Sequence, residues 1–136
     1  MMVSTRGRYA LRLMVDIAKQ GDAGVLVTMR QAAERLNLSV KYLEQLGGAL
    51  VRAGILKSIR GVSGGYYLAM EPKDIVIGDV LRATEGDCMP VVSAGGKSKA
   101  VEEGPEALAF WRGMGNAICA YMDGVTLADM LDGSLE

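Results

Sequence analysis

The stretch TMRQAAERLNLSVKYLEQLGGALVR, residues 28–52, decides the fold. Thr28 followed three positions later by Gln31 has the form of a capping box and predicts the start of a helix. Asn37 favours the left-handed conformation that ends a helix, and Ser39 is placed to cap a second helix directly afterwards. Two short helices separated by so tight a turn predict a helix-turn-helix.

A pair of β-prone runs follows these helices. Residues 55–60, ILKSIR, and residues 66–70, YYLAM, flank a glycine-containing loop, GVSGG, at residues 61–65. Two such runs around a short glycine-containing loop predict a β-hairpin. A helix-turn-helix followed directly by a hairpin is the arrangement of a winged helix.

An N-terminal helix precedes these elements. Apolar residues recur at helical spacing between Tyr9 and Ala18, and residues 25–27, VLV, form a short β-prone stretch after it. We therefore expect a mainly α protein with a winged helix-turn-helix DNA-binding domain over residues 1–84. This domain would consist of three helices and a hairpin wing.

The C-terminal part has a different character. Residues 85–104 lack periodicity and predict a flexible, sensor-type loop. Pro105 and Glu106 suit the first turn of a long helix, predicted to end at Met122 or Asp123 within a dimerisation segment, residues 105–136. The helix carries two apolar stripes and so needs two burial partners, its own domain and a second copy of the chain. The predicted dimerisation residues are Leu108, Phe110, Trp111, Met114, Ile118, Tyr121 and Met122.

Charge is divided unevenly along the chain. Residues 1–70 carry ten Lys and Arg against four acids, a net charge of +6, whereas residues 71–136 carry five against twelve, a net charge of −7. A basic half joined to an acidic half suggests that one end meets a polyanion. Charge alone does not decide this, because solvated faces also become asymmetric by chance.

Composition excludes several classes of protein. No apolar run approaches the roughly 18–20 residues of a membrane helix. The chain has two cysteines, which make no disulfide framework, and no histidine. The absence of histidine excludes enzymes that use a Ser-His-Asp triad or a Cys-His pair. The sequence also contains no glycine-rich nucleotide-binding motif. We expect a cytoplasmic protein that is not an enzyme.

The second helix of the helix-turn-helix is the predicted recognition helix. Leu43, Leu46 and Leu50 face the core, and the opposite face is formed by Lys41, Tyr42, Gln45, Ala49 and Arg52. Gln pairs with adenine, Lys reaches guanine or phosphate, and Ser39 and Tyr42 suit backbone oxygens. An ordinary polar helix face is the alternative. Gly47 and Gly48 fall inside this helix, where they would either permit close packing or bend it.

The hairpin loop adds a second candidate contact. Arg60 lies at its shoulder, and Ser63 and Gly64 lie near its tip. An arginine beside bare backbone suits a phosphate or the minor groove. The alternative is that the three glycines of the loop serve only the turn.

Several motifs resemble the Rrf2 family of bacterial transcription regulators over residues 2–131. They are STRGRYAL at 4–11, YLEQL at 42–46, RGVSGGY at 60–66, IGDV at 77–80 and TLAD at 126–129. The resemblance implies a dimeric winged-helix protein that contacts DNA through the start of its first helix, its recognition helix and its wing. With the exposed cations, the predicted DNA-binding residues are Ser4, Thr5, Arg6, Arg8, Thr28, Arg30, Ser39, Lys41, Tyr42, Glu44, Gln45, Arg52, Lys57, Arg60, Ser63 and Gly64.

The chain departs from this family in its cysteines. Many members hold an iron–sulfur cluster through three cysteines in the loop before the long helix, but here that loop holds only Cys88. Cys119 falls on the apolar face of the long helix, where a packed thiol is expected. Because clusters usually need four thiolates, we expect no cofactor and no metal. Cys88 remains a candidate sensor, although nearby acids disfavour its thiolate.

The leading hypothesis is a homodimeric, sequence-specific regulator that acts as a repressor on a pseudo-palindromic operator in double-stranded DNA. The loop of residues 85–104 is a candidate site for an unknown effector. The alternative hypothesis is a winged-helix module that has lost DNA binding and binds a protein or a small metabolite.

Overall fold

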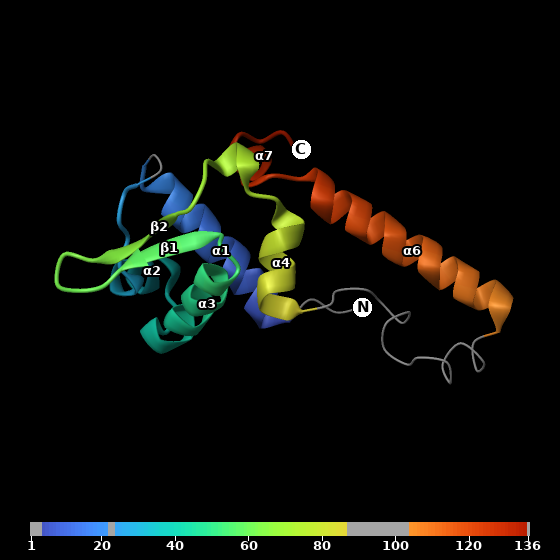
Figure 1. Ribbon diagram of the computed structural model, residues 1–136, viewed down its shortest axis with the longest axis horizontal. Helices are drawn as coiled ribbons and strands as arrows, with labels where there is room; N and C mark the ends of the chain where they lie inside the picture. The colour runs from blue at the N-terminus through green and yellow to red at the C-terminus, as the bar shows by residue number, and fades with distance from the viewer. Residues whose placement is uncertain (1–3, 22–23, 87–103, 136) are drawn as a thin grey trace.

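The chain forms a head of packed helices with a wing at one end and one long helix projecting from it (Figure 1). The computed structural model describes residues 4–21, 24–86 and 104–135. Its elements are α1 (Thr5–Lys19), α2 (Met29–Leu36), α3 (Val40–Arg52), β1 (Leu56–Ile59), β2 (Gly65–Leu68), the 3-10 helix η1 (Pro72–Asp74), α4 (Ile77–Glu85), α6 (Pro105–Gly124) and α7 (Leu127–Leu131). The predicted helix-turn-helix is therefore α2 and α3.

Side-chain caps set the helix boundaries of the helix-turn-helix. Thr28 Oγ1 accepts from the Gln31 backbone N–H at 3.1 Å, and the Gln31 side chain accepts from the Thr28 N–H at 3.0 Å. Asn37 adopts the left-handed conformation, with φ 56° and ψ 49°, and ends α2. Ser39 Oγ accepts from the Tyr42 N–H at 3.0 Å and begins α3. The capping pattern in the sequence is confirmed at all three points.

The core lies between α1, α3 and α4 and is closed by the end of the chain. Leu13, Leu43 and Leu50 are fully buried, and so is Leu127 of α7. The Leu127 N–H donates to the Ile75 carbonyl at 2.8 Å, so the C-terminal segment returns to the head after α6. Burial of these side chains, worth about 1.5–3 kcal/mol each, makes α7 part of the same core.

The wing is a two-stranded antiparallel hairpin with one extra pairing. Its register runs from Leu56 opposite Leu68 to Ile59 opposite Gly65. The Val27 N–H donates to the Tyr66 carbonyl at 2.8 Å, and the Tyr66 N–H donates to the Val27 carbonyl at 2.7 Å. The hairpin is thereby joined to the residue before the Thr28 cap.

Two glycines of the wing are required by its backbone. A Cβ atom at Gly64 would collide with the carbonyl oxygen of Ile59. Gly65 has a φ of +156°, and a Cβ there would lie 2.9 Å from the Val27 carbonyl oxygen. The third loop glycine, Gly61, has a φ of +111°, which also favours glycine. The backbone of the hairpin and its pairing with Val27 therefore account for all three glycines, in agreement with the alternative that the sequence left open.

Two bidentate ion pairs connect elements that lie far apart in the sequence. Arg35 of α2 donates to both carboxylate oxygens of Asp16 of α1 at 2.8 Å, and this contact raises the pKa of Arg35. Because Asp16 is 7% exposed, removing Arg35 would leave a buried, uncompensated carboxylate. Arg82 of α4 likewise holds Asp123 of α6, at 2.8 and 2.7 Å.

The second ion pair persists at neutral pH. Its hydrogen bond from Arg82 lowers the pKa of the Asp123 carboxyl, and the hydrogen bond to Asp123 is the main cause of a raised Arg82 pKa. A carboxylate with a depressed pKa keeps its partner until the pH falls through that lowered value. The attachment of α6 to α4 is therefore insensitive to pH changes near neutrality.

Within the described residues, α6 rests on the head at its C-terminal end. The helix has 20 residues and so measures roughly 30 Å, and it projects beyond the head in Figure 1. Met122 is 6% exposed and belongs to the core, and Ile118 packs against that core. Both were predicted as dimerisation residues. The burial of Met122 within the head of its own chain contradicts that prediction for Met122, whereas Ile118 is only partly buried and stays a predicted dimerisation residue. Phe110 and Tyr121, by contrast, are 62% and 65% exposed.

Candidate nucleic-acid interface

A groove of about 450 Å³ runs between the helix-turn-helix and the wing. The N-terminal end of α2, the outer face of α3 and the turn of the hairpin form its walls. Five predicted DNA-binding residues line it, namely Thr28, Arg30, Glu44, Arg60 and Gly64. The fold thus brings together residues that are up to 36 positions apart in the sequence.

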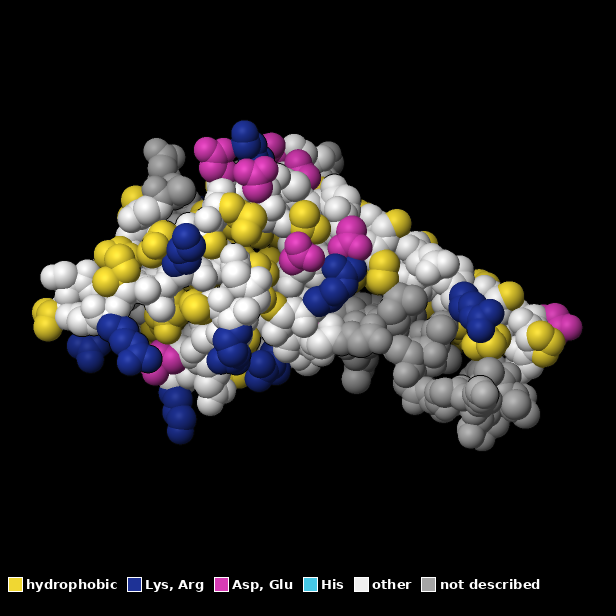
Figure 2. Space-filling model, viewed as in Figure 1, with side chains coloured by type: hydrophobic (Ala, Val, Ile, Leu, Met, Phe, Trp, Pro, Cys, Tyr) yellow, Lys and Arg dark blue, Asp and Glu magenta, His cyan; other side chains and the backbone are white. Residues whose placement is uncertain are grey.

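Positive charge gathers around this groove. Figure 2 shows Lys and Arg side chains along the edge of the head that carries the wing and α3, and Asp and Glu side chains gathered at the opposite edge around α7. Arg30, Lys41 and Arg60 are exposed, as are Arg52 and Lys57 at the far ends of α3 and β1. Exposed cations around a groove are the electrostatic footprint of a nucleic-acid interface.

The exposed face of α3 matches the prediction in part. Lys41, Glu44 and Gln45 are exposed. Ser39 is also exposed, but its oxygen already accepts the Tyr42 N–H as the cap of the helix. Ala49 is 7% exposed, so its placement on the outer face is wrong, because this side of α3 turns inward towards the core.

The side chain of Tyr42 packs against the core instead of standing free on the outer face of α3. Its ring packs edge-to-face on Tyr9 of α1, with centroids 5.8 Å apart. Its hydroxyl is buried and has no hydrogen-bond partner within the described residues. The predicted contact of this hydroxyl with DNA is corrected accordingly. Tyr42 acts in this structure as a packing residue between α3 and α1.

The start of α1 does not line the groove. Ser4 Oγ donates to Glu85 Oε1 at 2.6 Å, and the Gly7 N–H donates to the same oxygen at 2.8 Å. Arg6 Nε donates to the Thr84 carbonyl at 3.0 Å. Ser4, Thr5, Arg6 and Arg8 are exposed, but they form a second basic region beside the end of α4. The predicted DNA-binding residues therefore fall into two groups.

Among the groove residues that the prediction missed are two polar side chains of the hairpin strands. Ser58 of β1 and Tyr66 of β2 line the groove and lie directly opposite each other in the hairpin. Because side chains alternate along a strand, the register of the hairpin would have placed both on one face. The β-prone runs in the sequence predicted the hairpin but not its register.

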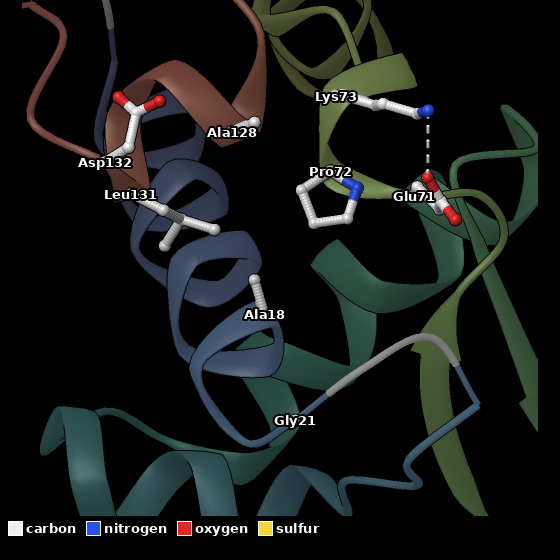
Figure 3. A pocket seen from close by; sticks show the side chains of 8 residues that line it. All are labelled: Ala18, Gly21, Glu71, Pro72, Lys73, Ala128, Leu131 and Asp132. Atoms are coloured by element: carbon white, nitrogen blue, oxygen red, sulfur yellow. Dashed lines mark ion pairs between the residues drawn. The ribbon is translucent and has the colours of Figure 1, made fainter.

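A larger hollow at the other side of the head differs in its charge. It measures about 790 Å³ and lies between α1, η1 and α7. Figure 3 shows Lys73 paired with Glu71 at 3.4 Å, with Asp132 also on the wall. This wall has no excess of cations among its residues and does not resemble a surface for phosphates.

A helix-turn-helix with a hairpin wing and a cationic groove between them defines a winged-helix DNA-binding protein. The chain belongs to the Rrf2 family, whose model, described as an iron-dependent transcriptional regulator, matches residues 3–133. It is thus a DNA-binding transcription regulator and not an enzyme, as the sequence predicted.

Named relatives agree with this assignment. The regulator CymR of Bacillus subtilis is 38% identical over 130 residues, which cover 96% of this chain and 89% of CymR. The regulator IscR of Aliivibrio salmonicida is 32% identical over 133 residues, covering 96% of this chain and 77% of IscR.

Solved structures agree in fold. The structure of B. subtilis CymR, described as the global cysteine regulator, has a TM-score of 0.77 at 36% identity and matches 96% of this chain and 95% of its own. The structure of T. potens IscR has a TM-score of 0.75 at 37% identity, and the match covers 98% of this chain and 88% of the IscR chain. In the described parts of this chain, no helix is long and apolar enough to cross a membrane.

The donors in this chain do not fit an iron–sulfur cluster held by a single copy. The sequence has two cysteines and no histidine, whereas such clusters usually take four thiolates. Cys119 is partly buried on α6, where its thiol interacts with Arg82. Cys88 and most of the predicted loop of residues 85–104 lie outside the described residues.

Arg60 provides a direct test of the groove. Arg60→Ala is expected to weaken binding to a specific duplex by about 1 kcal/mol at fixed salt, the size of one lost specific contact. The affinity is read from a fluorescence-anisotropy titration. Lys73→Ala is the matched control, because it removes an exposed cation from the other side of the head. Equal affinities for Arg60→Ala and the unmodified chain would remove the wing from the interface.

Proposed function

We propose that this regulator acts as a homodimer that represses transcription by occupying a pseudo-palindromic operator. The groove between α3 and the wing, with Arg30 and Arg60 on its walls, is the observation that carries the proposal. Lys41 and Gln45, which are exposed at the start of α3, would contact base edges in the major groove, with Ser39 beside them.

The remaining cations would supply affinity rather than specificity. Arg6, Arg8, Arg52 and Lys57 are exposed outside the groove and suit phosphate oxygens on either side of it. Glu44 lies in the groove among these cations. Its carboxylate repels phosphate but accepts from cytosine N4, so it would contribute to the choice of sequence.

The test is a DNA titration at two salt concentrations. Duplexes selected by the protein from a random pool serve as the specific probe, and a scrambled duplex serves as the control. Because phosphate contacts release counterions, affinity is expected to fall steeply between about 50 and 200 mM salt. The selected duplex should bind more tightly than the scrambled duplex at both salt concentrations. Weak binding with no salt dependence would instead favour a module that has lost DNA binding.

A second copy of the chain is the proposed partner of α6. The head covers Met122 and packs against Ile118 at one end of this helix, but Phe110 and Tyr121 remain exposed. Leu108, Trp111 and Met114 are only partly covered. A two-fold axis beside the helix would pack these side chains against the same stripe of the second copy and bury the apolar surface. It would also set two grooves about one helical turn of DNA apart, ~10 base pairs, or a multiple of it.

The dimer proposal is tested on the exposed apolar stripe. Phe110→Asp is expected to yield monomers at micromolar concentration, because it would place a charge inside the paired surface. Asn116→Asp adds the same charge on another exposed face of α6 and serves as the control. Analytical ultracentrifugation distinguishes the two species. If Phe110→Asp and Asn116→Asp both sediment as dimers, this interface is contradicted.

The proposed regulator carries no iron–sulfur cluster and works in the cytoplasm. Its signal would reach it through residues 85–104, with Cys88 as a candidate sensor or with an unknown effector. Protein purified without oxygen is expected to show no cluster absorption in the visible range and no bound iron. A brown protein with stoichiometric iron would contradict the cluster-free proposal and would require ligands shared between two copies.

A further inference from the structure

The two glycines within α3 have different surroundings. A Cβ atom at Gly47 would lie 3.0 Å from Cε2 and 3.3 Å from Cζ of the Tyr66 ring. A Cβ atom at Gly48 would lie 3.3 Å from Nη1 of Arg52, the far end of an exposed side chain on the same helix. Glycine disfavours a helix, so a reason for Gly47 is needed. The close packing of the Tyr66 ring supplies it.

Tyr66 is also held by its backbone. Its N–H and carbonyl both bond to Val27, at 2.7 and 2.8 Å. Gly65, the preceding residue, passes so close to the Val27 carbonyl that a Cβ there would lie 2.9 Å from its oxygen. The strand β2 is therefore fixed at Tyr66 from two directions, by the segment before α2 and by the surface of α3.

One partner of this contact, Tyr66, belongs to the lining of the groove. Tyr66 lines the groove and pairs with Ser58, which precedes Arg60 by two residues along the wing. A shift of the ring away from α3 would move it into the groove or carry the hairpin with it. Either movement would change the position of the wing relative to the recognition helix.

We propose that the contact between Gly47 and Tyr66 sets the distance between the wing and the recognition helix, which makes both positioning residues for operator recognition. This inference rests on the proposed function for its DNA readout. The geometric part, the placement of the hairpin on α3, is independent of any operator.

The matched pair of variants is Gly47→Ala and Gly48→Ala. Both add one methyl group and raise helix propensity at neighbouring positions of α3, so neither is expected to lower the melting temperature greatly. Gly47→Ala is expected to weaken binding to the selected duplex about fivefold or more, with little change on the scrambled duplex. Gly48→Ala is expected to bind both duplexes like the unmodified chain.

A compensating variant distinguishes positioning from a general loss of structure. Tyr66→Leu removes the ring atoms that the new methyl group would meet. Gly47→Ala should therefore cost less operator affinity when it is added to Tyr66→Leu than when it is added to the unmodified chain. Equal operator affinity for Gly47→Ala and Gly48→Ala, or the same cost of Gly47→Ala on both backgrounds, would overturn the proposal.

A second measurement needs no DNA. Residual dipolar couplings of backbone amides report the orientation of β1 and β2 relative to α3. We expect a changed orientation in Gly47→Ala and none in Gly48→Ala. Unchanged couplings in Gly47→Ala would overturn the inference even if the unmodified chain binds its operator. Changed couplings in a chain that selects no duplex would instead reject the proposed function and keep the geometric inference.

Discussion

The two backbone hydrogen bonds between Val27 and Tyr66 connect the elements that form the proposed DNA interface. They pair one residue ahead of the Thr28 cap with the returning strand of the wing. Leu56 and Leu68 already anchor the base of the hairpin in the core. The bonds to Val27 add a second attachment at Tyr66, and a two-stranded ribbon needs such partners because it is marginally stable in water by itself. With this attachment, the start of α2, the face of α3 and the wing share one framework, and the groove between them keeps its shape.

Charge and shape then divide the head into two sides. Several cations of the N-terminal half lie in or near the groove, while acids of the C-terminal half gather around α7 at the opposite edge (Figure 2). The chain returns to the head through α7, so the acidic end is fixed on the side away from the wing. A nucleic acid approaching this molecule is attracted to one edge and repelled from the other.

Among the described residues, the long helix is attached to the head through its C-terminal end. Met122 enters the core, and Arg82 holds Asp123 with two hydrogen bonds. These contacts fix the direction in which α6 leaves the head, and so they fix the position of Phe110 and Tyr121 in solvent. The spacing of two heads in the proposed dimer would follow from this direction.

The sequence alone determined the local structure. Caps at Thr28 and Ser39 and the turn at Asn37 depend on neighbouring residues, and each lies where the sequence placed it. The tertiary structure decided which side chains were available. It turned the Tyr42 hydroxyl inward, covered Met122 with its own head and placed the start of α1 outside the groove. The close approach of Tyr66 to Gly47 also comes from packing between distant segments. Helix periodicity predicts on which face of a helix a residue lies. It does not predict which neighbour covers that face, because the neighbour is set by contacts across the whole chain.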